Sequence, residues 1–128
     1  MIDIPVSPTS LTTMVVFING AVNLYFNNGG SYVGASQRYQ SLVQAGRILV
    51  ANAARILGEC EKAKTFALPM GQPHKIHLLT RKGVFVKDVL PEEIKQESND
   101  MQSVYFLYQQ VMRELRTAQL KDHAAGQV

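Results

Sequence analysis

The chain has 128 residues and a formal net charge of +3; 46% of its residues are hydrophobic and 18% are charged. This length fits one domain, and the hydrophobic content excludes an intrinsically disordered chain. The single cysteine, Cys60, excludes an intrachain disulfide and favours a reducing compartment, so we expect a cytoplasmic protein. The N-terminus lacks the positive region of a signal peptide. The apolar stretch 11–26 is too short for a membrane helix, which needs about 20 apolar residues.

Charge is distributed very unevenly along the chain. Residues 4–37 contain no Asp, Glu, Lys, Arg or His, and Asp3 is the one charged residue that precedes them. A surface segment usually carries charges on its solvated side. The gap therefore indicates that this segment is covered by the rest of the fold, by a second copy of the chain or by another partner.

The first element, residues 11–26, fits two templates. Asn19-Gly20 suits the tight turn of a β-hairpin, but the flanking residues do not alternate between polar and apolar. Read with helical spacing, the apolar residues form one stripe, and Pro8 suits a helix start. The helical template fits better, and hairpin is the alternative. The stripe consists of Leu11, Val15, Ile18, Val22 and Tyr25.

A second, longer helix is predicted over residues 31–64. Its apolar residues alternate spacings of three and four over four heptads, and no proline interrupts them. Gly46 and Ala53 lie on this apolar seam. Because small residues let a neighbouring backbone approach closely, we expect a tightly crossing helix there.

The remainder of the chain predicts one hairpin and one helix. Two β-rich runs within residues 75–89 flank a turn that contains Gly83. Pro91 then opens a last helix, and we expect a flexible tail over residues 121–128. The predicted fold is therefore mainly α (α+β). It is a single helical domain over residues 1–128, in which long antiparallel helices form a bundle and the hairpin lies between the second and the last helix.

Candidate catalytic and metal-binding residues are few. His74 and His77 would point to opposite faces of a strand, and neither has a third or fourth ligand at a suitable spacing. Cys60 lies on the apolar seam, where a cysteine acts as a small hydrophobic residue. Glu92 and Glu93 suit the first turn of a helix. We therefore expect no catalytic, cofactor-binding or metal-binding residue and no enzyme activity.

The charge gap and the heptads together favour an interaction protein. We expect a helical adaptor or regulator that forms a homodimer or binds a protein partner, with no membrane partner. Its contact would join the uncharged N-terminal element to the seam of the second helix. The expected contact residues are Val16, Asn19, Asn23, Tyr39, Gly46 and Ala53.

The alternative is a small regulator that binds nucleic acid. A basic hairpin beside helices can lie against phosphates, and residues 78–83 resemble the wing turn of winged-helix regulators. The resemblance covers six residues, and the preceding helix lacks the interruption that a helix-turn-helix pair requires. The cations that would contact phosphate are Lys75, Arg81, Lys82 and Lys87.

Overall fold

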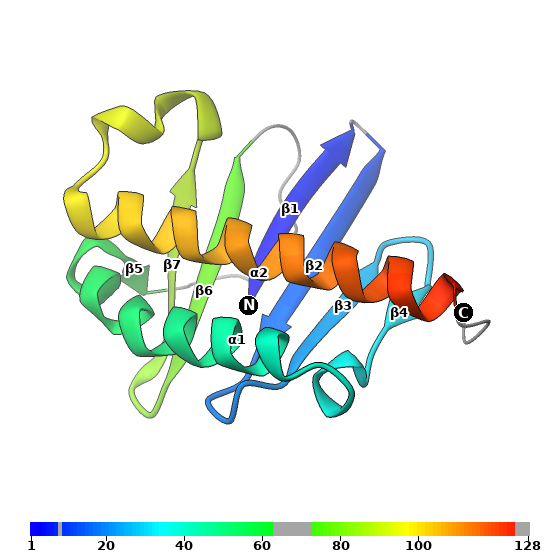
Figure 1. Cartoon of the computed structure of the whole chain (residues 1–128). Coiled ribbons are helices and arrows are strands. Elements are labelled where there is room, and N and C mark those ends of the chain that lie inside the picture. Colours follow the sequence, from blue (N-terminus) through cyan, green and yellow to red (C-terminus); the bar gives the residue numbers. More distant parts are fainter. Residues whose placement is uncertain (8, 63–72, 125–128) are drawn as a thin grey trace.

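The computed structural model describes residues 1–7, 9–62 and 73–124. Within these ranges the chain forms a seven-stranded antiparallel sheet in the order β4-β3-β2-β1-β6-β7-β5. Two α-helices lie side by side across one face of that sheet (Figure 1). The strands are β1 (Ile2–Ser7), β2 (Ser10–Val16), β3 (Val22–Phe26), β4 (Ser31–Tyr32), β5 (Glu61–Lys62), β6 (His74–Thr80) and β7 (Gly83–Val89). The helices are α1 (Gln40–Ala53) and α2 (Asn99–Ala124), with 3-10 helices at Ala35–Gln37, Ala54–Glu59 and Pro91–Gln96.

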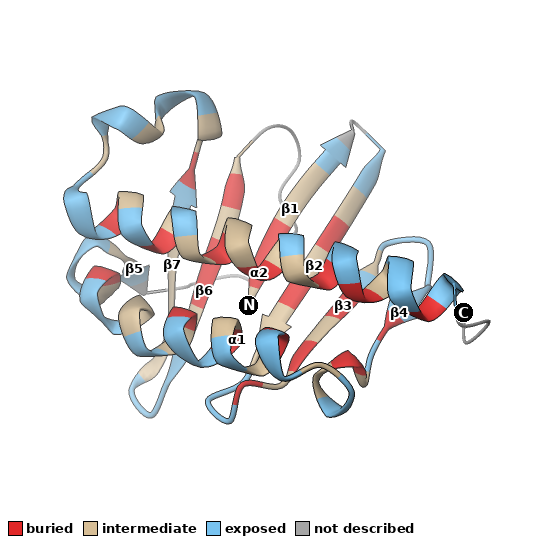
Figure 2. Ribbon diagram, viewed as in Figure 1, coloured by how far each residue is buried: buried red, intermediate tan, exposed pale blue. Residues whose placement is uncertain are grey.

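The predicted helical bundle is wrong. The helices cover one face of a sheet that contains β1 at its centre, and strands from both halves of the chain meet there. Figure 2 shows buried residues along the strands and along the two helices that cross them, and the buried hydrophobic residues form one core cluster. This core joins the sheet, through Met14, Leu24 and Ile76, to α1 and α2, through Leu42 and Tyr108. No helix in the described ranges is both long and apolar enough to cross a bilayer.

Residues 11–26 form a β-hairpin, so the preferred helical interpretation is wrong and the alternative holds. The turn is closed by Phe17, whose N–H donates to the carbonyl of Ala21 at 2.9 Å, while Asn19 Oδ1 accepts from the Ala21 N–H at 3.0 Å. Gly20 takes a φ of 90° at this turn, which other residues adopt at a cost. Both faces of β2 and β3 are partly apolar, and that composition hid the two-residue period of the strands.

The prediction of one long helix over residues 31–64 is also wrong. Residues 31–32 form the short strand β4, α1 begins at Gln40, and the chain tightens into a 3-10 helix after Ala53. At Cys60 the backbone is extended and leads into β5, and residues 63–64 lie outside the described ranges. The predicted seam is buried, since Leu42, Gly46, Leu49 and Ile56 are inaccessible. It faces the sheet and α2 rather than a bundle of long helices.

The small residue Gly46 does allow a close approach, but of a turn rather than a helix. A Cβ added at Gly46 would lie 3.0 Å from the carbonyl oxygen of Gly20 and 3.0 Å from Val22 Cγ2. On the other side of this contact, a Cβ at Gly20 would lie 2.6 Å from the Val43 carbonyl oxygen. The β2–β3 turn therefore rests on α1 through two glycines.

The hairpin over 75–89 is confirmed, as β6 and β7 pair from His74↔Val89 to Thr80↔Gly83. It is part of the main sheet, because β6 also pairs with β1. The last helix begins later than predicted: residues 91–96 form a 3-10 helix, and Ser98 Oγ then accepts from the Met101 N–H at 3.1 Å. Residues 121–124, expected in a flexible tail, form the last turn of α2, while residues 125–128 lie outside the described ranges.

Candidate functional site

The outer face of the sheet, opposite the helices, is the first candidate surface. No helix or strand of the described residues covers it. Because side chains alternate along a strand, Ile2 and Met14 point toward the helices while their neighbours Asp3 and Thr13 point outward. We call the outward residues of β2 and β3 the uncharged face. They are Leu11, Thr13, Val15, Asn23 and Tyr25.

This face owes its lack of charge to the gap in the sequence. Residues 4–37 supply nearly all of β1 to β4, so that half of the sheet contains no charged side chain except Asp3, which is 2% exposed. Tyr25 is 43% exposed, and Phe17, just beyond the end of β2, is 47% exposed. On a chain of net charge +3, this half of the sheet therefore has an uncharged outer face, with Tyr25 exposed and the other four residues half-buried, and no helix or strand of the described residues lies over it.

A cavity of about 420 Å³ lies where the central strand begins. It is bounded by the end of β2, the end of β6 and the second half of α1, and none of its described lining residues is Asp, Glu, Lys or Arg. We call this cavity the strand slot. Its apolar walls include Val16, Phe17, Leu49, Ala53, Leu57 and Leu79.

The six expected contact residues do not lie on one surface. Gly46 is buried against the β2–β3 turn, and Val16 and Ala53 line the strand slot. Asn19 lies in the exposed hairpin turn, whereas Asn23 belongs to the uncharged face and accepts from the Gly34 N–H at 3.4 Å. Tyr39 belongs to a different site altogether, a polar cluster at the end of α2. The helical interpretation placed these residues on common stripes, whereas the strands of the structure separate them.

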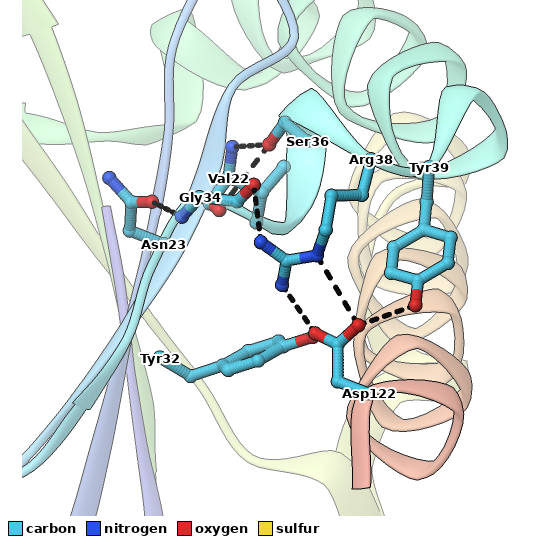
Figure 3. Close-up of polar contacts among 8 residues, drawn as sticks. All are labelled: Val22, Asn23, Tyr32, Gly34, Ser36, Arg38, Tyr39 and Asp122. Atoms are coloured by element: carbon cyan, nitrogen blue, oxygen red, sulfur yellow. Dashed lines mark hydrogen bonds and ion pairs between the residues drawn. The ribbon is translucent and has the colours of Figure 1, made fainter. Parts of the chain in front are cut away.

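The polar cluster at the end of α2 was missed by sequence analysis. Asp122 accepts hydrogen bonds from the hydroxyl of Tyr32 at 2.6 Å and from that of Tyr39 at 2.5 Å, and it forms an ion pair with Arg38 (Figure 3). Asp122 is 1% exposed, although it lies in a segment rich in small and polar residues. We call these four residues the Asp122 cluster.

Charge and hydrogen bonding in this cluster favour the ionised carboxylate. Hydrogen bonds from Arg38, Tyr32 and Tyr39 lower the pKa of Asp122 to about 2. Burial, together with the hydrogen bond to Asp122, raises the pKa of Tyr32 to about 12. The hydrogen bond to the same carboxylate raises the pKa of Tyr39. Since the carboxylate oxygens are occupied by three partners, the arrangement ties α2 to the β4 side of the sheet.

His77 lies on the outer side of β6 and is 3% exposed. Its Nδ1 has no hydrogen-bond partner among the described residues and lies 3.8 Å from Asp3 Oδ2, while Thr13 Oγ1 donates to Asp3 Oδ1 at 2.5 Å. Burial lowers the pKa of His77, with Asp3 acting in the opposite direction. In a hydrolytic triad the histidine stands between the hydroxyl and the carboxylate. Here the carboxylate stands between the hydroxyl and the histidine, so the order of the three groups differs from that of a triad.

His74 occupies the opposite side of the same strand, as its spacing from His77 predicts. Its Nδ1 lies 2.8 Å from the hydroxyl of Tyr108, and its ring stacks on Tyr105. Burial lowers the pKa of His74 and raises that of Tyr108. The two histidines therefore belong to separate environments. Within the described ranges no three side chains of the metal-ligating types gather in one place.

The four candidate phosphate contacts are divided among three places. Lys75 points to the outer side of β6 and lies 4.0 Å from Asp88. Lys87 faces the other side of the hairpin, opposite Ile76, and forms an ion pair with Glu97 at 3.2 Å. Arg81 and Lys82 are exposed at the turn. Only this last pair is placed together, and nucleic-acid binding stays a prediction.

The remaining candidates from the sequence are Cys60 and the pair Glu92 and Glu93. Cys60 is partly buried, its Sγ donates to the Ile56 carbonyl at 3.3 Å, and burial raises the pKa of its thiol. Glu92 and Glu93 lie in the first turn of the 3-10 helix Pro91–Gln96.

Comparisons with protein-family models, with curated proteins and with solved structures found no match.

Proposed function

We propose that this protein is a non-catalytic interaction domain that self-associates through the uncharged face. The observation that carries the proposal is an uncharged and partly exposed face of the sheet, over which no helix or strand of the described residues lies, on a chain of net charge +3. Contiguous exposed apolar surface on a folded domain is typical of an interaction site. The expected partner is a second copy of the chain.

Electrostatics favour a second copy as the occupant of this face. In a two-fold symmetric dimer each residue near the axis approaches its own copy, so any charge there would be opposed by a like charge. Residues 4–37 provide no such charge. Two basic molecules therefore meet with the least repulsion when their uncharged faces come together. The apolar seam of the predicted second helix has no part in this contact, because Leu42, Gly46 and Leu49 of α1 are buried within the protein.

The test is the molar mass in solution of two matched variants, measured by light scattering on a sizing column. Tyr25→Glu introduces a charge that would face its own copy, so we expect the wild-type dimer to become a monomer. Phe106→Glu makes the same kind of change at an exposed aromatic residue of α2, on the helical side, and should leave the dimer intact.

Two outcomes would contradict the proposal. One is a wild-type protein that stays monomeric at high concentration. The other is a dimer that survives Tyr25→Glu but dissociates in Phe106→Glu, which would place the interface on the helices. Circular dichroism on each variant shows whether the fold is retained, so that loss of the dimer is not confused with unfolding.

A further inference from the structure

Two hairpin turns lie at the same end of the sheet. β2 and β6 both pair antiparallel with β1, so they run in the same direction and end on the same side, about 10 Å apart. The turn after β2 contains Phe17 and Ile18, and the turn after β6 contains Arg81 and Lys82. Figure 1 shows both turns at the lower edge of the molecule, away from the end at which β1 finishes. We call these four residues, together with Arg47 of α1, the turn surface.

The apolar part of this surface is held outward. Ile18 is 85% exposed, more than any other large hydrophobic residue in the described ranges. The Gly20 N–H donates to the Phe17 carbonyl at 2.9 Å, and Arg47 Nε donates to the Asn19 carbonyl at 3.1 Å. These hydrogen bonds, with the close contact of Gly20 on α1, fix the main chain of the turn. The side chain of Ile18 is therefore fixed in solvent rather than in the core.

The charges around the turns have one sign. Residues 4–58 and 74–87 supply β2 to β4, α1, β6 and most of β7, and they contain no Asp or Glu. Asp3 lies near the start of β1, but it is buried and accepts a hydrogen bond from a threonine. β5 carries Glu61, which pairs opposite Val86 rather than at the turn. The three cations of the turn surface, by contrast, are all exposed.

This combination complements an anionic lipid surface. The headgroup layer of a bilayer that contains phosphatidylserine is negative, and each Lys or Arg close to it strengthens binding. An apolar side chain that protrudes beside those cations can enter the boundary between headgroups and acyl chains. The phosphates of a nucleic acid would also attract Arg81 and Lys82, but they would leave Ile18 in water. The exposed isoleucine therefore favours the lipid surface.

We propose that the turn surface binds the surface of a bilayer that contains anionic lipids. Phe17 and Ile18 insert among the headgroups, and the three cations contact the negative lipids. This contact needs no spanning segment, and no helix in the described ranges could provide one. The sequence predicted no membrane partner because the helical interpretation of residues 11–26 hid the turn. The site goes beyond self-association, since it uses the turns rather than the uncharged face.

The test is sedimentation of the protein with sucrose-loaded vesicles of phosphatidylcholine that contain one quarter phosphatidylserine. Vesicles of phosphatidylcholine alone are the comparison, and both are used at low ionic strength, where charges are screened least. We expect binding to the anionic vesicles to be at least about tenfold stronger. No binding to the anionic vesicles, or equal binding to the two kinds, would overturn the proposal.

A matched pair of variants tests the inserted residue. Ile18→Glu should weaken binding to the anionic vesicles at least about tenfold, because a carboxylate would meet the negative headgroups. Val6→Glu makes the same kind of change at an exposed residue near the other end of β1 and should bind as the wild type does. Circular dichroism shows that each variant is folded. Binding that survives Ile18→Glu, or that falls as far in Val6→Glu, would place the contact elsewhere and overturn the proposal.

A second pair of variants tests the cations. The double variant Arg81→Ala, Lys82→Ala should lose binding at least about tenfold. Arg113→Ala, Arg116→Ala removes the same charge from exposed positions of α2 and should bind as the wild type does. Equal losses in the two double variants would reduce the effect to net charge and overturn the site.

Two further outcomes separate this proposal from its neighbours. Binding of fluorescein-labelled oligouridylate that requires Arg81 and Lys82 but not Ile18, without binding to vesicles, would assign the cations to nucleic acid and overturn the proposal. A wild-type protein that is monomeric and still binds the anionic vesicles would support this site while removing the proposed dimer.

Discussion

At the scale of single residues, Asp122 shows how a buried charge is accommodated. Its carboxylate is 1% exposed, and an unpaired charge there would be strongly unfavourable. Three partners compensate for this, and each comes from a segment more than 80 positions away in the chain. The cluster therefore forms only when the last turn of α2 reaches the segment between β4 and α1.

Replacement of Asp122 by Asn should lower the free energy of unfolding at neutral pH, because Arg38 would lose its carboxylate partner. The matched control is Asp88→Asn, which removes a carboxylate that is 60% exposed and 4.0 Å from Lys75. That control should change stability little, since surface ion pairs contribute weakly. Urea denaturation at pH 7 compares the three proteins.

The same pair of variants has an expected pH dependence. The pKa of Asp122 is lowered to about 2 from 3.8, so its ionised form stabilises the fold above the unfolded pKa. This contribution is lost as the pH falls toward the folded pKa, so the difference between wild type and Asp122→Asn should shrink between about pH 4 and pH 2. A difference that stays constant over this window would show that Asp122 does not act through its charge.

At the scale of elements, the contact between α1 and the β2–β3 turn depends on the absence of two side chains. Replacement of Gly46 by Ala would by itself stabilise the helix by about 1 kcal/mol, because alanine has the higher helix propensity. Its Cβ, however, would lie 3.0 Å from the carbonyl oxygen of Gly20, in a turn that already touches Val43 on its other side. Because overpacking costs about 1–3 kcal/mol, we expect Gly46→Ala to be destabilising.

Gly58→Ala is the matched control, since nothing lies within 4 Å of a Cβ at that position. It should leave stability unchanged or raise it by up to about 1 kcal/mol. The measurement is the melting temperature of both variants compared with that of the wild-type protein. If Gly46→Ala melts at or above the wild-type temperature, the turn yields easily and the close approach is not a constraint.

At the scale of the whole molecule, the first 30 residues are half of the sheet. They form β1, β2 and β3, and they contribute the buried residues Ile2, Met14, Val22 and Leu24. β1 is also the central strand, because β6 pairs with it. The N-terminal segment is therefore required to complete the core and cannot be a separable interaction arm.

A truncated protein that begins at Ser31 should fail to fold. Without β1–β3 the two helices would lose much of the apolar surface on which they pack, and β6 would lose a neighbour. We expect no cooperative transition on urea denaturation and a loss of strand signal in circular dichroism. A truncated protein that unfolds cooperatively would show that α1, α2, β6 and β7 form an independent core.

Local sequence signals determined part of this structure. The hairpin around Gly83 and a last helix after Pro91 could be predicted, because turn chemistry and helix-start signals act within a few residues. Residues 11–26 could not be assigned correctly, because apolar residues on the outer face remove the alternation that marks a strand. The lack of alternation was itself the signal of the uncharged face.

The sequence by itself determined a single domain with an uncharged N-terminal segment over residues 4–37, a hairpin within residues 75–89 and a C-terminal helix. Only the tertiary structure decided that the uncharged segment is half of a sheet, that Asp122 joins Arg38 and two tyrosines, and that the turns after β2 and β6 lie at one end of the sheet. The reason is physical. Propensity and periodicity are local properties, whereas strand order, register and the pairing of a buried charge depend on residues far apart in the chain.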